Sequence, residues 1–235
     1  MSGSERRDQI AANLATVRGR IASACAEAGR DPEDVQLVVV TKFFPASDVR
    51  LLAGLGVRDV GENRHQEAEA KAAECADLGL RWHFIGGLQS NKAAAVAAYA
   101  DVVESVDRRK LISPLARGAR ERGRALDVLI QVSLDPPGSA GRSGADPAEV
   151  AQLAAAVRDT EELRLRGLMA VAPLGADPAV AFERLGEVRR AFLADHPEAT
   201  WLSAGMSGDL EEAVRAGATH VRIGSAVLGS RPQVK

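Results

Sequence analysis

The chain has 235 residues, of which 46% are apolar and only 3% are aromatic, so Ala, Val and Leu must fill its core. Its 30 basic and 32 acidic residues give a formal net charge of -2. This near balance gives no excess of positive charge that would attract nucleic acid or an anionic membrane surface, so neither is expected as a partner.

The cysteines and the start of the chain point to a reducing compartment. Cys25 and Cys75 are far apart and lie in helical, alanine-rich segments, so they indicate neither a disulfide framework nor a zinc site. The N-terminus lacks the basic, apolar and cleavage-site pattern of a signal peptide, and no apolar run approaches membrane-spanning length. We therefore expect a cytoplasmic protein.

The first predicted element is an amphipathic helix from about Glu5 to Ala28, which Gly29 ends. Strand and helix patterns then alternate along the chain. The predicted strands are Gln36–Thr41, Arg58–Gly61, Trp82–Ile85, Val102–Val106, Asp127–Val132, Arg166–Val171, Thr200–Leu202 and His220–Ile223. The predicted helices between them are Ser47–Leu55, Arg64–Ala76, Asn91–Tyr99, Arg108–Arg122, Pro147–Arg158, Pro178–Ala194 and Gly208–Ala216.

Eight strands with intervening helices predict one α/β domain over residues 1–235, a (β/α)8 TIM barrel with an extra N-terminal helix. A doubly wound open sheet is the alternative, because periodicity does not reveal barrel closure. The longest irregular stretch, Asp135–Ala145, follows the fifth strand and is rich in Pro and Gly. It is either a lid at the barrel mouth or an ordinary solvent loop.

Lys42 directly follows a run of apolar residues, Leu37–Val40, and Thr41. Such a run is typical of a strand covered on both faces, and Pro45 opens the next helix. The C-terminal end of a parallel strand is where α/β proteins build their sites. A partly desolvated lysine there can have a lowered pKa and act as an amine nucleophile. A solvated lysine at a strand end is the alternative.

Two glycine-rich turns follow the last two predicted strands. The first is Ser203–Asp209, in which Ser207 is a candidate helix N-cap, and the second is Arg222–Ser225. In barrels, the loops after strands seven and eight frequently form a phosphate site. Glycines also simply end strands, but two such turns in this register favour a phosphate site.

Three further polar residues stand in a predicted strand or just after one. Arg222 alternates with apolar neighbours, so its side chain either enters the barrel mouth, where it could donate to an anion or a ring nitrogen, or makes a surface ion pair. Asn63 either orients a ligand or caps the next helix. His83 stands between Trp82 and Phe84 and is interpreted as a hydrogen-bonded core histidine.

Six motifs along the chain together resemble one known family. They are VVVTKFFP around Lys42, GEN at 61–63, WHFIGGLQSNK at 82–92, RGLMAV from Arg166, LSAGMSGD from Leu202 and VRIGSAVLG from Val221. In this order they resemble the YggS/PROSC family of pyridoxal 5′-phosphate (PLP) homeostasis proteins over essentially the whole chain. Ala204 replaces a common Met, and Val227-Leu228 replaces a common Ile-Phe pair, and neither change removes a polar ligand.

The resemblance implies a barrel like the N-terminal domain of alanine racemase, known as PLP fold type III. It also implies that PLP is held as an internal aldimine on Lys42. The other residues carried over by motif are Asn63 beside the cofactor, Arg222 near the pyridine nitrogen, and Ser207, Gly224, Ser225 and the backbone of Met206 at the phosphate. No catalytic residue and no metal ligand are implied.

The function implied is that of a PLP carrier, which buffers the cofactor or delivers it to apo PLP-dependent enzymes. One alternative is a PLP enzyme with weak racemase or transaminase activity, and another is a PLP-independent barrel enzyme acting on a phosphorylated metabolite. Two-base racemization needs an acid/base on each face of the substrate carbon, and the sole tyrosine, Tyr99, lies in a helix away from any predicted strand end. The lack of a second domain favours a monomer.

Overall fold

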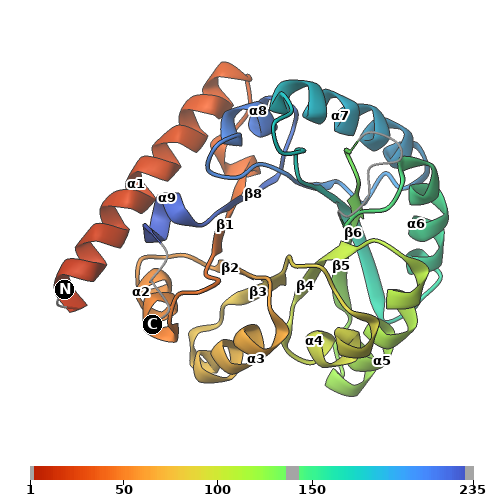
Figure 1. The fold of residues 1–235 in the computed structure, drawn as a ribbon, viewed down its shortest axis with the longest axis horizontal. Coiled ribbons are helices and arrows are strands. Elements are labelled where there is room, and N and C mark those ends of the chain that lie inside the picture. The colour runs from red at the N-terminus through yellow and green to blue at the C-terminus, as the bar shows by residue number, and fades with distance from the viewer. Residues whose placement is uncertain (1–2, 136–142, 231–235) are drawn as a thin grey trace.

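The computed structural model describes residues 3–135 and 143–230. Eight parallel strands close into a barrel in chain order, with the helices outside it (Figure 1). The strands are β1 Gln36–Val40, β2 Asp59–Glu62, β3 Arg81–Phe84, β4 Val102–Val106, β5 Leu126–Val132, β6 Leu163–Ala170, β7 Trp201–Ser203 and β8 His220–Ile223. The α-helices are α1 Gly3–Glu27, α2 Ala46–Gly54, α3 His65–Glu74, α4 Ala93–Tyr99, α5 Ile112–Arg122, α6 Val150–Arg158, α7 Pro178–Asp195, α8 Leu210–Arg215 and α9 Ser225–Leu228.

Barrel closure is confirmed by the pairing of β1 with β8, in which Val38 lies opposite Arg222. The open-sheet alternative is therefore wrong. Strand β6 begins at Leu163, three residues before its predicted start, because its first residues pair in register with β5, Leu126 opposite Leu163. The alternation of Leu and Arg over residues 163–166 is itself a strand pattern, and the predicted start overlooked it. The short helix α9 was not predicted.

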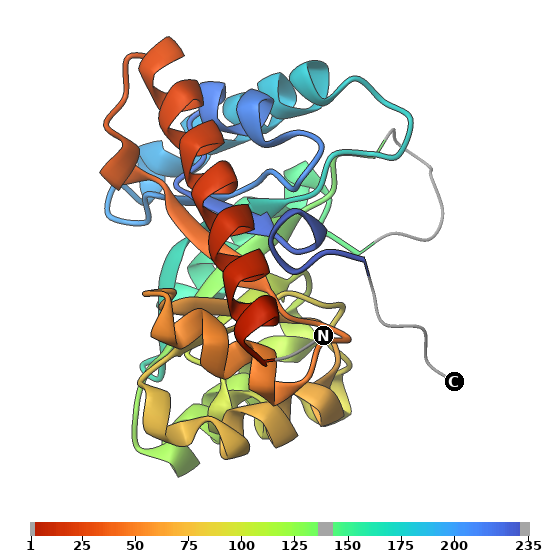
Figure 2. The ribbon, with the colours of Figure 1, turned by 90° about the vertical axis from the view of Figure 1, so that its left-hand side faces the viewer.

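The N-terminal helix α1 buries one apolar face against the barrel's last helices. Ile10, Leu14, Val17 and Ile21 recur at helical spacing and are all buried. The helix contacts α8 and α9, and Figure 2 shows it crossing that side of the barrel. It therefore braces the segments that follow β7 and β8.

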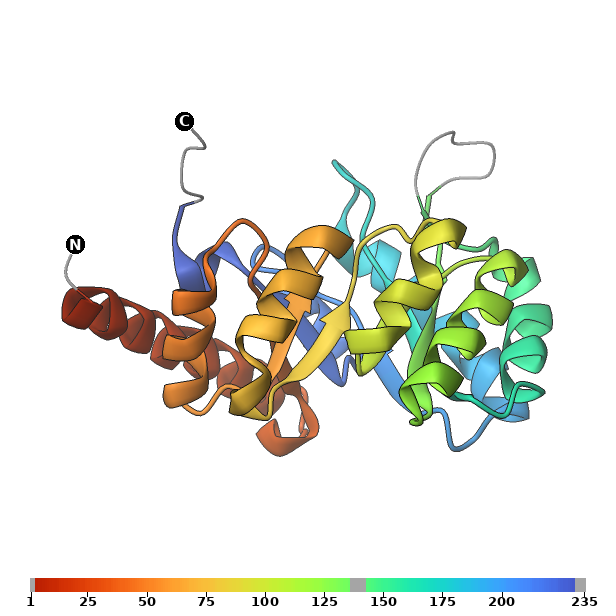
Figure 3. The ribbon, with the colours of Figure 1, turned by 90° about the horizontal axis from the view of Figure 1, so that it is seen from below.

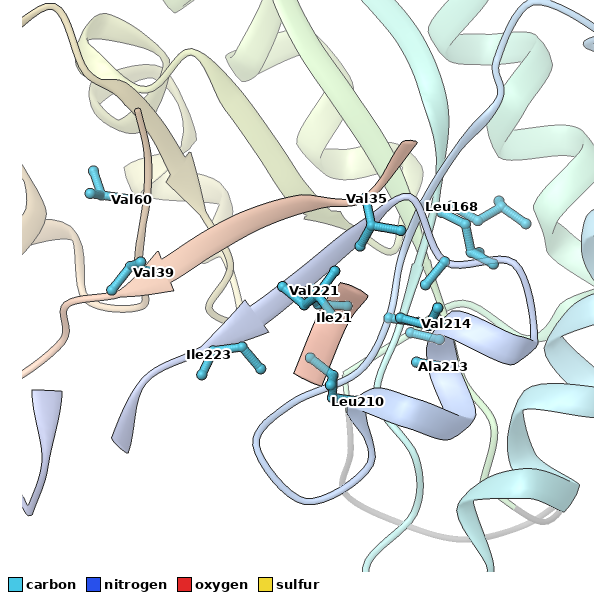
Figure 4. Close-up of a cluster of buried hydrophobic side chains, with 14 of the residues drawn as sticks. Ile21, Val35, Val39, Val60, Leu168, Leu210, Ala213, Val214, Val221 and Ile223 are labelled. Atoms are coloured by element: carbon cyan, nitrogen blue, oxygen red, sulfur yellow. The ribbon is translucent and has the colours of Figure 1, made fainter. Parts of the chain in front are cut away.

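The core lies between the strands and the surrounding helices. Val221 of β8, Ile21 of α1 and Leu210 of α8 lie together in Figure 4, and all are buried. Burial of each such side chain contributes about 1.5–3 kcal/mol. This packing holds β8 and its neighbour β1 in fixed register, and so fixes the positions of their C-terminal ends.

The side view in Figure 3 shows the helices standing alongside the strands around the barrel. None of the helices in the described part of the chain is long and apolar enough to span a membrane. The barrel interior is partly apolar, with Val102, Leu129 and Met169 in contact, and partly polar. The polar part leads to the candidate site.

Candidate functional site

The C-terminal ends of four neighbouring strands, β7, β8, β1 and β2, carry the residues that the sequence singled out. Val40 pairs with Gly61, and Val39 pairs with Ile223. The amide of Arg222 donates to Gly205 O over 2.9 Å, which ties the turn after β7 to β8. The structure thus brings the predicted site residues of these strands and turns to one mouth of the barrel.

Lys42 is half-buried in the turn between β1 and α2. Thr41 before it is fully buried, and its amide donates to Gly61 O over 2.9 Å. Pro45 is the residue directly before α2, so the prediction that it opens this helix is confirmed. Lys42 therefore stands in a turn directly after the strand that the apolar run predicted, and the residue before it is held by β2.

Asn63 presents an unused acceptor at the end of β2. Its Oδ1 is buried and has no hydrogen-bond partner. The N-cap of α3 is Arg64, which makes no side-chain cap bond, so the prediction that Asn63 caps this helix is wrong. A β-carbon at Gly86 would lie 2.2 Å from Asn63 O, so glycine alone allows the turn after β3 to pack against Asn63. A buried unpaired amide oxygen is costly and suits a ligand-binding role.

The turn after β7 is held by Asp209 rather than by Ser207. The N-cap of α8 is Asp209, and its Oδ1 accepts from the Met206 amide over 2.5 Å. The prediction that Ser207 is the N-cap is therefore wrong, and a phosphate would have to share the Met206 amide with Asp209. Gly205 has φ 92°, a left-handed conformation that favours glycine.

Helix α1 supports this turn from outside. Arg20 forms an ion pair with Glu211 of α8 over 2.7 Å, and its Nη2 donates to Ser207 O over 3.1 Å. In the second turn, a β-carbon at Gly224 would lie 3.3 Å from Val40 O, so the backbone after β8 passes close to β1. Ser207 is half-buried and Ser225 is exposed, so both hydroxyls are accessible.

Arg222 enters the barrel, and the surface ion-pair alternative is wrong because only 4% of the residue is exposed. Its Nη1 donates to Ser203 Oγ over 2.6 Å, and its Nη2 donates to Ala170 O over 2.8 Å. Glu104 Oε2 lies 3.9 Å from Nη1. These two hydrogen bonds use two of the five N–H donors of a guanidinium, which keeps its proton although burial lowers the pKa of Arg222.

His83 is a hydrogen-bonded core histidine, as predicted. Its Nδ1 lies 2.7 Å from Glu104 Oε1 and its Nε2 lies 3.0 Å from Asp59 Oδ1. Burial alone would lower the pKa of His83, but the bonds to Asp59 and Glu104 raise it. Burial would likewise raise the pKa of Glu104, yet the bond and charge of His83, with help from Arg222 and Ser203, lower it to about 2. Ionised Glu104 therefore links His83 to Arg222.

We call Asp59, His83, Glu104, Ser203 and Arg222 the interior polar chain. Ser203 Oγ donates to Glu104 Oε2 over 2.5 Å and so completes the connection. Sequence reasoning missed the roles of Glu104, Ser203 and Asp59. One signal was present, because Glu104 interrupts the otherwise apolar start of a predicted strand.

His220 lies beside the interior polar chain but is held neutral. Its Nδ1 is 2.9 Å from Thr219 Oγ1, and its ring centroid is 4.5 Å from that of Trp201. Its Nε2 is buried without a partner, and burial lowers the pKa of His220 to about 4. Within residues 3–135 and 143–230, no group of three or more His, Cys, Asp or Glu side chains is placed to hold a metal ion.

A cavity of about 360 Å³ opens at the C-terminal ends of β5 and β6 and reaches Met206. The irregular stretch Asp135–Ala145 begins and ends beside it, where Ala145 N donates to Gln131 O over 2.7 Å. Residues 136–142 lie outside the described residues, so its two interpretations, a lid and an ordinary solvent loop, both stay predictions.

Comparison with known proteins identifies the family of the chain. Residues 6–232 match the family model described as alanine racemase, N-terminal domain. A pyridoxal phosphate homeostasis protein of Mycobacterium tuberculosis is 44% identical, and the alignment covers 97% of this chain and 95% of the relative.

Two solved structures are also similar over nearly the whole chain. PipY of Synechococcus elongatus PCC7942, solved with PLP bound, is 37% identical with a TM-score of 0.78, covering 94% of this chain and 100% of that chain. An unknown protein from Bifidobacterium adolescentis is 32% identical with a TM-score of 0.87, covering 97% of each chain. The resemblance inferred from the motifs is confirmed, and the chain belongs to the pyridoxal phosphate homeostasis protein family, built on the alanine racemase N-terminal domain barrel.

Proposed function

We propose that this chain binds PLP at the barrel mouth, with Lys42 as the covalent anchor, and acts in PLP homeostasis. The observation that carries the proposal is the convergence of an amine, an unpaired amide oxygen, a buried guanidinium and two glycine turns on four adjacent strand ends. The structure of PipY with PLP bound, at 37% identity, supports the same ligand here.

The residues present fit PLP group by group. When bound, PLP supplies an electrophilic aldehyde carbon, and its pyridine ring acts as an electron sink. Lys42 offers a primary amine to that carbon. The buried Oδ1 of Asn63 has no hydrogen-bond partner and could accept a hydrogen bond from bound PLP. Ser207, Gly224 and Ser225 offer hydroxyl and backbone donors to the phosphate, because two hydroxyls are accessible and glycine leaves the backbone open.

In this proposal Arg222 faces the pyridine nitrogen of bound PLP, where it would affect how strongly the ring withdraws electrons. An arginine donates a proton in a hydrogen bond but does not give it up, so a ring nitrogen facing Arg222 stays unprotonated. An unprotonated nitrogen weakens the electron sink and disfavours carbanion chemistry. This supports storage of the cofactor more than turnover of amino acids.

We further propose that the protein works as a monomeric single barrel that buffers PLP or delivers it to apo-enzymes. Among residues 3–135 and 143–230, the large apolar side chains that are exposed are only Leu174, Val180 and Met206, which leaves little surface for a stable dimer. The two free cysteines are buried, which fits the reducing conditions of a cytoplasm.

The test is a PLP titration followed by a transfer assay. Protein stripped of ligand is titrated with PLP, and the absorbance of bound PLP is followed for wild type, Lys42→Ala and the control Lys92→Ala. We expect wild type and Lys92→Ala to develop the same spectrum and Lys42→Ala to lack it. Loaded wild type should then activate an apo PLP-dependent enzyme faster than an equal amount of free PLP in the presence of a PLP scavenger.

Two results would contradict the proposal. Wild type that shows no spectral change with PLP would contradict PLP binding. Steady conversion of any member of a panel of amino acids by loaded wild type would replace the carrier with the alternative, a PLP enzyme with weak racemase or transaminase activity.

A further inference from the structure

The two peptide groups that flank Lys42 are both held by side chains of α3. The carbonyl of Thr41, on one side, accepts from Lys71 Nζ over 2.8 Å. The amide of Phe43, on the other side, donates to Glu67 Oε1 over 2.6 Å. These contacts fix the backbone immediately before and immediately after the lysine.

The two side chains that make these contacts belong to one largely buried ionic group with Glu62, and we call Glu62, Glu67 and Lys71 the α3 clamp. Lys71 Nζ lies 2.7 Å from Glu62 Oε1 and 2.6 Å from Glu67 Oε1, so its three donors are all used. The side chain of Lys71 is 8% exposed and that of Glu62 is 1% exposed. Thr41 Oγ1 also donates to Glu62 Oε1 over 2.6 Å. Hydrogen bonds in such a water-poor setting are strong and directional.

The backbone held by the clamp is strained. Phe43 has φ 70°, the only positive φ of a non-glycine residue in the part of the chain that the structure describes. A bulky side chain in the left-handed region is unfavourable, and such a conformation persists only where the surroundings enforce it. The bond from Phe43 N to Glu67 is one enforcing contact, and Arg64, 5.1 Å from the centre of the Phe43 ring, is another.

We propose that Glu67 and Lys71, with Glu62 behind them, are positioning residues that set the direction in which Lys42 presents its amine. The proposal rests on the function proposed above, because it assigns a purpose to the turn that carries the anchor. Strain in a turn that bears the reacting residue is a known feature of functional sites. The two bonds from the α3 clamp meet the peptide groups on both sides of Lys42, so they act on the orientation of this residue.

The mildest test is Glu67→Ala, since the side chain of Glu67 is 24% exposed and its loss leaves the bonds from Lys71 to Glu62 and Thr41 in place. The matched control is Glu69→Ala, the same substitution on the same helix at a side chain that is 58% exposed. Two quantities are measured: the amide hydrogen exchange of Phe43 without ligand, and the rate at which bound-PLP absorbance develops after mixing.

We expect Glu67→Ala to speed exchange of the Phe43 amide and to slow PLP uptake by ~10- to ~100-fold, the range that misplacement of a reacting group costs. Glu69→Ala should match wild type in both. Lys71→Met should slow uptake more, and Lys71→Arg, which keeps the charge and donors, should recover part of the rate. If Lys71→Met does not fold, the result for Glu67→Ala decides.

The outcomes separate the two proposals. Wild type that takes up no PLP contradicts the proposed function. Wild type and Glu67→Ala that take up PLP at the same rate, although exchange at Phe43 is faster in the variant, contradict only the positioning role.

Discussion

Replacing Glu104 by Gln tests the charge at the centre of the interior polar chain. Glu104 is 1% exposed and contacts His83 and Ser203 directly, with Arg222 3.9 Å away. Its pKa is lowered from 4.5 to about 2, and each pKa unit corresponds to about 1.36 kcal/mol in favour of the charged form. Glu104→Gln keeps the shape but loses the charge, so the free energy of unfolding at pH 7 should fall by about 3 kcal/mol.

The stability that Glu104 contributes should also change with pH in a defined direction. The folded pKa of Glu104 lies below the unfolded pKa, so its contribution is complete above about pH 4.5 and is lost as the pH falls toward about 2. Urea unfolding followed by circular dichroism should show a constant gap between wild type and Glu104→Gln from pH 7 to 5, and a narrowing gap below pH 4.5. Glu74→Gln, at an exposed site, is the control. A gap under about 1 kcal/mol at pH 7, or one that does not narrow in acid, would refute the reasoning.

Three further predictions concern neighbouring residues. Burial lowers the folded pKa of His220 from 6.5 to about 4, so stability is lost as the pH falls from about 6.5 toward 4. In urea unfolding between pH 7 and 5, the free energy of unfolding of wild type should fall by about 2 kcal/mol more than that of His220→Asn. Equal losses would contradict this. Gly86→Ala places a β-carbon 2.2 Å from Asn63 O, so it should lower the stability measured by thermal unfolding by about 1–3 kcal/mol and weaken PLP binding. The control Gly54→Ala, whose β-carbon would meet nothing within 4 Å, should do neither. Arg222→Ala should change the absorbance spectrum of bound PLP while the circular dichroism stays that of a folded barrel, and an unchanged spectrum removes Arg222 from the site.

The sequence predicted the barrel wall and the strand ends well because their signals are local. The run Leu37–Val40 marks a doubly covered strand, and Pro45 marks the start of the next helix. The position of Lys42 at a strand end follows from these residues alone. The turn after β7 was placed correctly, but its cap was not, because Ser207 and Asp209 are both good capping residues and only the fold selects between them.

Contacts across the barrel could not be predicted from one sequence. Glu104 and Ser203 are 99 residues apart and meet only because the barrel closes. Glu67 and Lys71 stand four residues apart in the sequence, but helical spacing does not reveal that the pair packs against the Lys42 turn. That contact depends on which loop the helix covers, and this is a property of the tertiary fold.

The most direct test of the central claim is to locate the covalent anchor. Protein loaded with PLP is reduced with borohydride, digested, and analysed by peptide mass spectrometry. The account predicts one PLP-derived mass increment per chain on the peptide that contains Lys42, and none in Lys42→Ala. An increment of the same stoichiometry on another lysine, or a reduced protein without any increment, would contradict it.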